Sequence, residues 1–139
     1  TTSLTEAGEK ILRWNTSEAV AMPGQAYFAL RETVQKEPDL LLKILRAEKA
    51  SIIEVKRTEG RAMVERLSRQ WEVEGAKQVD FTVKAMRDEE ALWWQENPAL
   101  LLKNDVASWT SMVDGMGKVG LIKSGKATQF YTDEIVSRL

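Results

Sequence analysis

The fold class of this chain is decided by residues 19–58, which read AVAMPGQAYFALRETVQKEPDLLLKILRAEKASIIEVKRT. Between Gln25 and Leu30 two sets of side chains alternate: Ala26, Phe28 and Leu30 on one side, and Gln25, Tyr27 and Ala29 on the other. A period of two residues is typical of a β-strand, and the preceding Pro23-Gly24 is a turn signal. We therefore expect one or two strands near residues 19–31.

The second part of the same stretch has the period of a helix. It begins at Pro38, which suits the first helical position because its missing N–H has no intrahelical partner there. The sequence predicts an amphipathic helix from Pro38 to about Thr58. Glu48 falls on its apolar side, where a buried carboxylate would need a cationic or hydrogen-bonding partner. The expected apolar face consists of Leu41, Ile44, Leu45, Ile52 and Val55.

Three further helical patterns follow this long helix. A short helix fits residues 63–71 after Gly60, and Asp80 can cap another. Asn104 or Asp105 can cap the next, which the glycines that follow would stop. We expect an α/β or α+β fold that is helix-dominated, with one or two strands near residues 19–31 and four or five helices. Residues 1–139 would form a single domain or the C-terminal fragment of a two-lobe protein.

Composition excludes several kinds of chemistry. The 139 residues include no Cys and no His, which removes disulfides, thiol and Ser-His-Asp catalysis and His-ligated zinc from this chain. The 20 basic and 21 acidic residues give no field that would attract nucleic acid. We expect no enzyme activity, cofactor, metal or nucleic-acid partner. No apolar run reaches membrane-spanning length, and the first residues have neither Met nor a leader, as expected of a processed or excised segment.

Two sequence patterns that suggest ligand chemistry are incomplete. Neighbouring acids at 88–90 and 133–134 would point apart on a helix and could not converge on one ion, so a solvated face is the simpler interpretation. Residues 120–127 have the glycine spacing and lysine of a phosphate loop, but Ala127 stands where the hydroxyl residue belongs. Neither pattern predicts a site.

Aromatic residues give the candidate sites. Trp71 and Trp109 fall on helical apolar faces and are expected in the core. Trp93 and Trp94 are neighbours whose side chains diverge, so we expect at least one at an interface. Polar side chains beside the expected strand could meet a ligand, although a solvated strand face is the alternative. These candidate ligand-binding residues are Gln25 and Tyr27.

Residues 19–27, 31–47, 120–123 and 131–136 carry a resemblance to a known family. They resemble the second half of solute-binding proteins of ABC importers in the nitrate, sulfonate, taurine and thiamine-precursor group. In that family a strand leads into Asn-Pro-Glu/Asp and then into an amphipathic helix with an Ala near its middle. Here Glu37 replaces the Asn before Pro38. The resemblance covers about residues 10–139.

The resemblance implies the C-terminal part of a periplasmic-binding-protein-like (type II) fold, which works by closing two lobes around a small anion or heterocycle. It also implies an ABC permease as partner and a periplasmic or other extracytoplasmic location. The chain has about half the family's length. We therefore expect it to associate with itself, for example as a dimer, or with a second chain. Family enzymes related to desulfinases or to a histidine-consuming pyrimidine synthase are disfavoured by the absence of Cys and His.

A different class of function remains open from the residues alone. The chain could be a small helical interaction module or subunit that has no small-molecule ligand. It would dock another protein through Trp93, Trp94 and the leucine-rich face between Leu40 and Val55.

Overall fold

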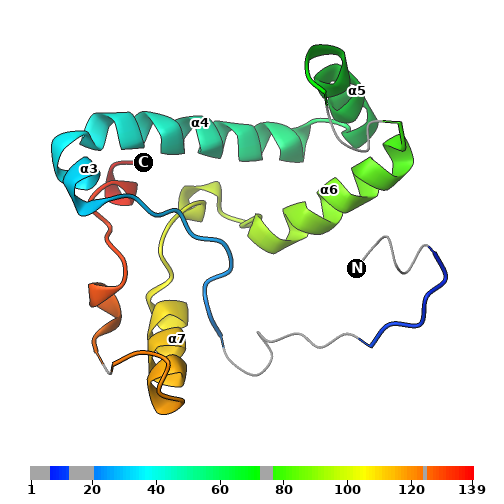
Figure 1. Cartoon of the computed structure of the whole chain (residues 1–139). Helices are drawn as coiled ribbons and strands as arrows, with labels where there is room; N and C mark the ends of the chain where they lie inside the picture. Colours follow the sequence, from blue (N-terminus) through cyan, green and yellow to red (C-terminus); the bar gives the residue numbers. More distant parts are fainter. Residues whose placement is uncertain (1–6, 13–20, 73–76, 124) are drawn as a thin grey trace. The chain divides into compact units, whose positions relative to one another are not determined.

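The computed structural model describes residues 7–12, 21–72, 77–123 and 125–139, and the elements in these ranges are helical (Figure 1). The α-helices are α3 (Arg31–Lys36), α4 (Pro38–Arg57), α5 (Gly60–Gln70), α6 (Val79–Trp93) and α7 (Val106–Lys118). Three short 3₁₀ turns complete the order: η1 (Pro98–Leu100), η2 (Ala127–Gln129) and η3 (Val136–Arg138).

The expected α/β or α+β fold is wrong, and so is the expected part of a periplasmic-binding-protein-like fold, since the described residues form no strand. Residues 21–30 run as irregular chain, and Leu30 ends them with the extended dihedrals φ −63° and ψ 143°. A strand needs a neighbour that pairs with its backbone N–H and C=O groups, and alternation in the sequence supplies no neighbour. The expectation that the chain is helix-dominated is confirmed. Ala19 and Val20 lie outside the described residues.

The chain divides into two compact units. One comprises residues 1–42 and 103–139, and the other comprises residues 43–102. Helix α4 begins in the first unit and ends in the second. No described helix is long and apolar enough to cross a membrane.

Helix α4 confirms the predicted start at Pro38 and ends one residue before Thr58. Its predicted apolar face is only partly buried. Ile52 is 8% exposed, whereas Ile44 is 50% exposed. Leu42, which was not assigned to that face, is buried instead. The pattern therefore predicts the helix correctly but not how far its face is covered.

The unit of residues 43–102 is built on close packing of α5 against α6. Glu59 caps α5 by accepting hydrogen bonds from the backbone N–H groups of Arg61 and Ala62, at 3.0 and 2.7 Å. Gly60 is buried, and a Cβ there would lie 2.7 Å from Val83 Cγ1 on α6. Glycine at this position lets the two helices approach closely. Met63 and Val64 on α5, buried one turn further along, extend the packed side of that helix.

Two predicted core tryptophans are less buried than expected. Trp71 follows the last residue of α5 and is 68% exposed, because the helix ends at Gln70. Trp109 on α7 is half-buried; its ring lies 5.3 Å from that of Tyr131. Helical spacing predicts which side of a helix a residue occupies, but not whether another element covers that side.

In the other unit, the C-terminal residues are held against the start of α7. Asp105 caps α7 by accepting from Ser108 N at 3.0 Å, which confirms one of the two predicted caps. Asn104 donates to the Asp133 carboxylate at 2.8 Å and accepts from Trp109 Nε1 at 3.1 Å. The side chains that are most buried in this part of the unit are Val113 and Ile135.

Candidate functional site

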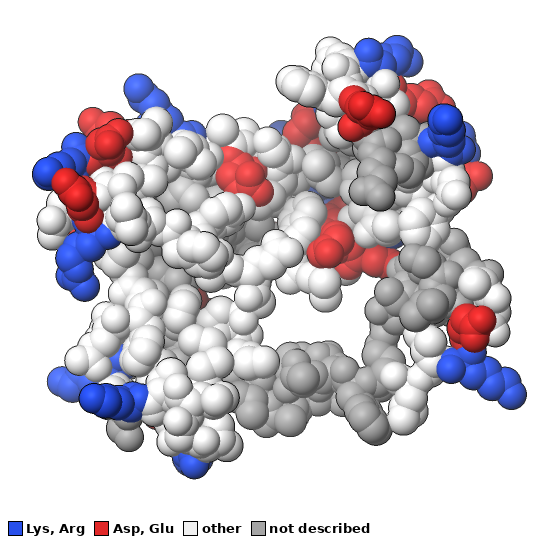
Figure 2. All heavy atoms as spheres, viewed as in Figure 1, with Lys and Arg blue, Asp and Glu red and all other residues white. Residues whose placement is uncertain are grey.

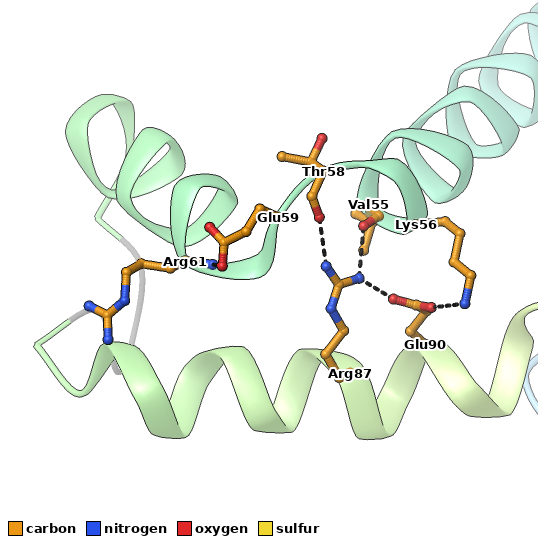
Figure 3. A network of polar contacts seen from close by, with 7 residues as sticks. All are labelled: Val55, Lys56, Thr58, Glu59, Arg61, Arg87 and Glu90. Atoms are coloured by element: carbon orange, nitrogen blue, oxygen red, sulfur yellow. Dashed lines mark hydrogen bonds and ion pairs between the residues drawn. The ribbon is translucent and has the colours of Figure 1, made fainter.

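The most strongly built polar cluster of the described residues surrounds Glu90, near the C-terminal end of α6 (Figure 3). Glu90 is 5% exposed. It accepts a hydrogen bond from Lys56 Nζ at 2.6 Å and another from the Arg87 guanidinium. A buried carboxylate between two cations is satisfied both in charge and in hydrogen bonding.

Arg87 also binds the backbone where α4 ends. Its guanidinium donates to the carbonyl oxygens of Val55 and Thr58, at 2.9 and 2.6 Å. The last carbonyls of a helix have no intrahelical donors, and a cation at this end is favoured by the helix dipole. Figure 3 shows Arg87 and Glu90 rising from α6 toward the turn between α4 and α5. Arg87 thus fastens the end of α4 to α6.

The surroundings of Glu90 favour its ionised form. Burial raises the pKa of Glu90, but hydrogen bonds from Lys56 and Arg87, together with their charges, outweigh burial and leave the pKa below its usual value. The side chains of Lys56 and Arg87 are 41% and 34% exposed, so both cations keep part of their hydration. The charged form of Glu90 is therefore the one that fits the fold.

The cluster includes one of the two predicted interface tryptophans. Lys56 Nζ lies 5.1 Å from the centroid of the Trp94 ring, within cation–π range. Trp94 is the C-cap of α6, and its backbone N–H donates to Glu90 O. Trp93, the last residue of α6, is half-buried, as is Trp94. An interface at these residues stays a prediction.

Gln25 and Tyr27 lie on the irregular segment of residues 21–30, with both side chains exposed. The structure places them in the other unit from Trp93 and Trp94. Their role in ligand binding also stays a prediction.

Two structural findings concern the polar side chains in the described part of the chain. No three acidic side chains gather there in a way that could hold a metal ion. Nor does any buried side-chain nitrogen or oxygen described there lack a hydrogen-bond partner. The phosphate-loop hypothesis also fails on structure, because residues 127–129 form a 3₁₀ turn where that motif requires an α-helix.

Several exposed charges lie in pairs of opposite sign. Arg66 and Glu54 are 3.2 Å apart, and Arg61 pairs with Asp80; all four side chains are about half-exposed or more. Figure 2 shows acidic and basic side chains close to one another on the face in view. Exposed pairs of this kind stabilise a fold only weakly.

Sequence reasoning missed the Glu90 cluster. It singled out Glu48 as the acid that needs a partner, but Glu48 is only half-buried. Glu90 is the last of the neighbouring acids 88–90, for which the sequence favours a solvated face. One signal was present: Arg87 and Glu90 are three residues apart, so they lie on one side of a helix, the side of Val83.

No family model matches this chain, and no curated protein or solved structure matches it significantly.

Proposed function

We propose that this chain is the helical C-terminal part of a solute-binding protein for ABC-type import, and that its exposed apolar segment is covered by the rest of that protein. The observation that carries this proposal is the character of residues 21–30. Phe28 is 96% exposed, and Tyr27 and Leu30 are also largely exposed. No charged residue occurs between positions 19 and 30. Contiguous exposed apolar surface is typical of a face that another polypeptide buries.

The sequence resemblance supplies the identity of that polypeptide in the proposal. The segment precedes α3 and α4, and Pro38 is the first residue of α4, in agreement with the Pro-acid start of the long helix in the family. In the proposed mechanism, a small anion or heterocycle binds between two lobes, and its binding energy favours the closed state over the open one. This chain would contribute binding and positioning groups and no covalent chemistry.

The test uses the product of the complete gene that encodes this chain. Its thermal unfolding is measured with a panel of small anions and heterocycles, among them nitrate, alkyl sulfonates and an aminopyrimidine. Ligand that binds only the folded state raises Tm, so at least one compound is expected to give a concentration-dependent rise. A complete product that melts at the same temperature with every compound would contradict solute binding.

A second function is favoured by a different observation, the exposed apolar residues of the unit of residues 43–102. Trp71 is 68% exposed and Leu92 is 80% exposed. In this alternative the chain is a helical interaction module, and these residues or the pair Trp93 and Trp94 dock another protein. The same melting experiment separates the two functions, since the module predicts no response to small solutes. Loss of a co-purifying protein on Trp94→Ala would support the module.

A further inference from the structure

A hollow at the C-terminal end of α7 follows from how that helix ends. Gly120 has φ +74°, a left-handed conformation that suits glycine. Its N–H donates to Gly117 O at 3.1 Å, and Leu121 N donates to Met116 O at 2.9 Å. These two bonds form a Schellman motif, which stops the helix. The chain that follows returns so that Gly125 lies against the last turns of α7, in the same unit.

The hollow between these segments has a volume of about 280 Å³. Its floor includes Val113, which is almost completely buried. Gly117 and Gly125 contribute no side chains, and Asp114 and Lys118 supply one charge of each sign. This volume lies just under the ~300 Å³ at which drug-sized sites begin, so a ligand of amino-acid size fits it.

The two charged residues of the hollow are four positions apart on α7, where side chains lie on the same side of a helix. This spacing commonly gives an ion pair, as it does for Glu32 and Lys36 on α3. Among the described residues, neither Asp114 nor Lys118 forms an ion pair or a side-chain hydrogen bond. A carboxylate and an ammonium group are thus both available at one small cavity.

We propose that this hollow binds a small zwitterion, an amino acid whose ammonium group meets Asp114 and whose carboxylate meets Lys118. A ligand with a single charge would be attracted by one of these two side chains and repelled by the other. Simple anions and amines are therefore disfavoured. Asp114 and Lys118 are both exposed, so a bound ligand keeps much of its contact with water and affinity in the millimolar range is expected. This site is separate from the proposed closure of two lobes, because it lies within one unit of this chain.

The test titrates the ¹⁵N-labelled 139-residue chain with β-alanine and follows backbone amides by NMR. Shifts that saturate are expected at residues 113–118 and at Gly125. Propionate and propylamine, which each carry one of the two charges, are expected to cause no saturable shift at these residues. Equal effects of either single-charge compound, or no saturable shift with β-alanine, would overturn the proposal.

Two variants and two matched controls locate the binding. Asp114→Asn and Lys118→Met each remove one charge-assisted contact, so each is expected to weaken β-alanine binding about tenfold. Lys123→Met and Glu89→Gln remove the same charges from exposed positions that do not line the hollow, and binding is expected to stay unchanged. If the control variants weaken binding as much as the hollow variants, the site is refuted. Amide spectra confirm that each variant keeps the fold.

Discussion

At the scale of single residues, Arg87 is the side chain on which the unit of residues 43–102 most depends. It binds buried Glu90 and two carbonyl oxygens at the end of α4. One guanidinium thus caps α4, pairs with the charge of Glu90 and holds the end of α4 against α6. Lysine could not reproduce this arrangement, because its ammonium lacks the planar fork of donors.

Arg87→Met is expected to destabilise the chain by about 3 kcal/mol, the lower end of the cost of leaving a buried charge without a partner, since Lys56 still faces Glu90. Urea denaturation measures the loss. Arg61→Met is the matched control: Arg61 pairs with Asp80 at an exposed site, so about 0–1 kcal/mol is expected there. Equal losses for the two variants would show that the Glu90 cluster contributes no more than a surface pair.

The depressed pKa of Glu90 predicts a definite pH dependence. The folded-state pKa lies below the ordinary value of 4.5, so the stabilising contribution of Glu90 is complete above pH 4.5. It is lost as the pH falls below 4.5 and through the folded-state pKa, where protonation ends both ion pairs. Denaturation midpoints measured across this range should fall more steeply for the native chain than for Glu90→Gln. Parallel curves would contradict this role.

At the scale of elements, helix α4 shows how far periodicity predicts packing. Ile44 and Ile52 both belong to the predicted apolar face, yet one is half-exposed and the other is buried. The two positions have the same residue type on the same helix, so they form a matched pair. The difference between them arises from neighbours that the sequence of α4 does not contain.

Ile52→Ala is expected to cost about 2–5 kcal/mol, because a buried side chain loses its transfer free energy and leaves a cavity. Ile44→Ala is expected to cost well under half of that, since half of its side chain already faces solvent. Urea denaturation of the two variants gives the comparison directly. A larger loss for Ile44→Ala would mean that α4 packs through a different side.

Much of the helical structure could be predicted from local sequence. Pro38, Asp105 and Gly120 act through the first or last turn of their own helices, so their effect is visible within a few residues. Two predictions that depend on contacts with residues distant in the sequence were wrong. Residues 21–30 have the alternation of a strand but pair with no strand among the described residues, and Trp71 has a helical apolar position but is 68% exposed.

The candidate sites show the same difference between local features, which the sequence predicts, and contacts with distant residues, which it does not. Trp94 was noticed because adjacent tryptophans cannot share one core, which is a local argument. The Lys56 ammonium beside it comes from α4, 34 positions before Glu90, and no local pattern indicates that pairing. The Asp114 and Lys118 pair was visible in spacing, but the hollow beside it depends on the returning chain at Gly125.

At the scale of the whole molecule, residues 21–30 form an exposed apolar segment that the proposed function places against another part of the protein. Backbone amides of an exposed irregular segment exchange quickly with solvent, whereas burial against another part of a protein protects them. A covered segment would also bring Phe28, almost fully exposed here, out of water.

Hydrogen–deuterium exchange of residues 21–30 tests this claim most directly, measured in the 139-residue chain and in the product of the complete gene. Amides on α5 serve as the internal reference, because α6 packs against that helix within this chain. We predict rapid exchange of residues 21–30 in the 139-residue chain and strong protection of the same residues in the complete product. Equally rapid exchange in both proteins would contradict it.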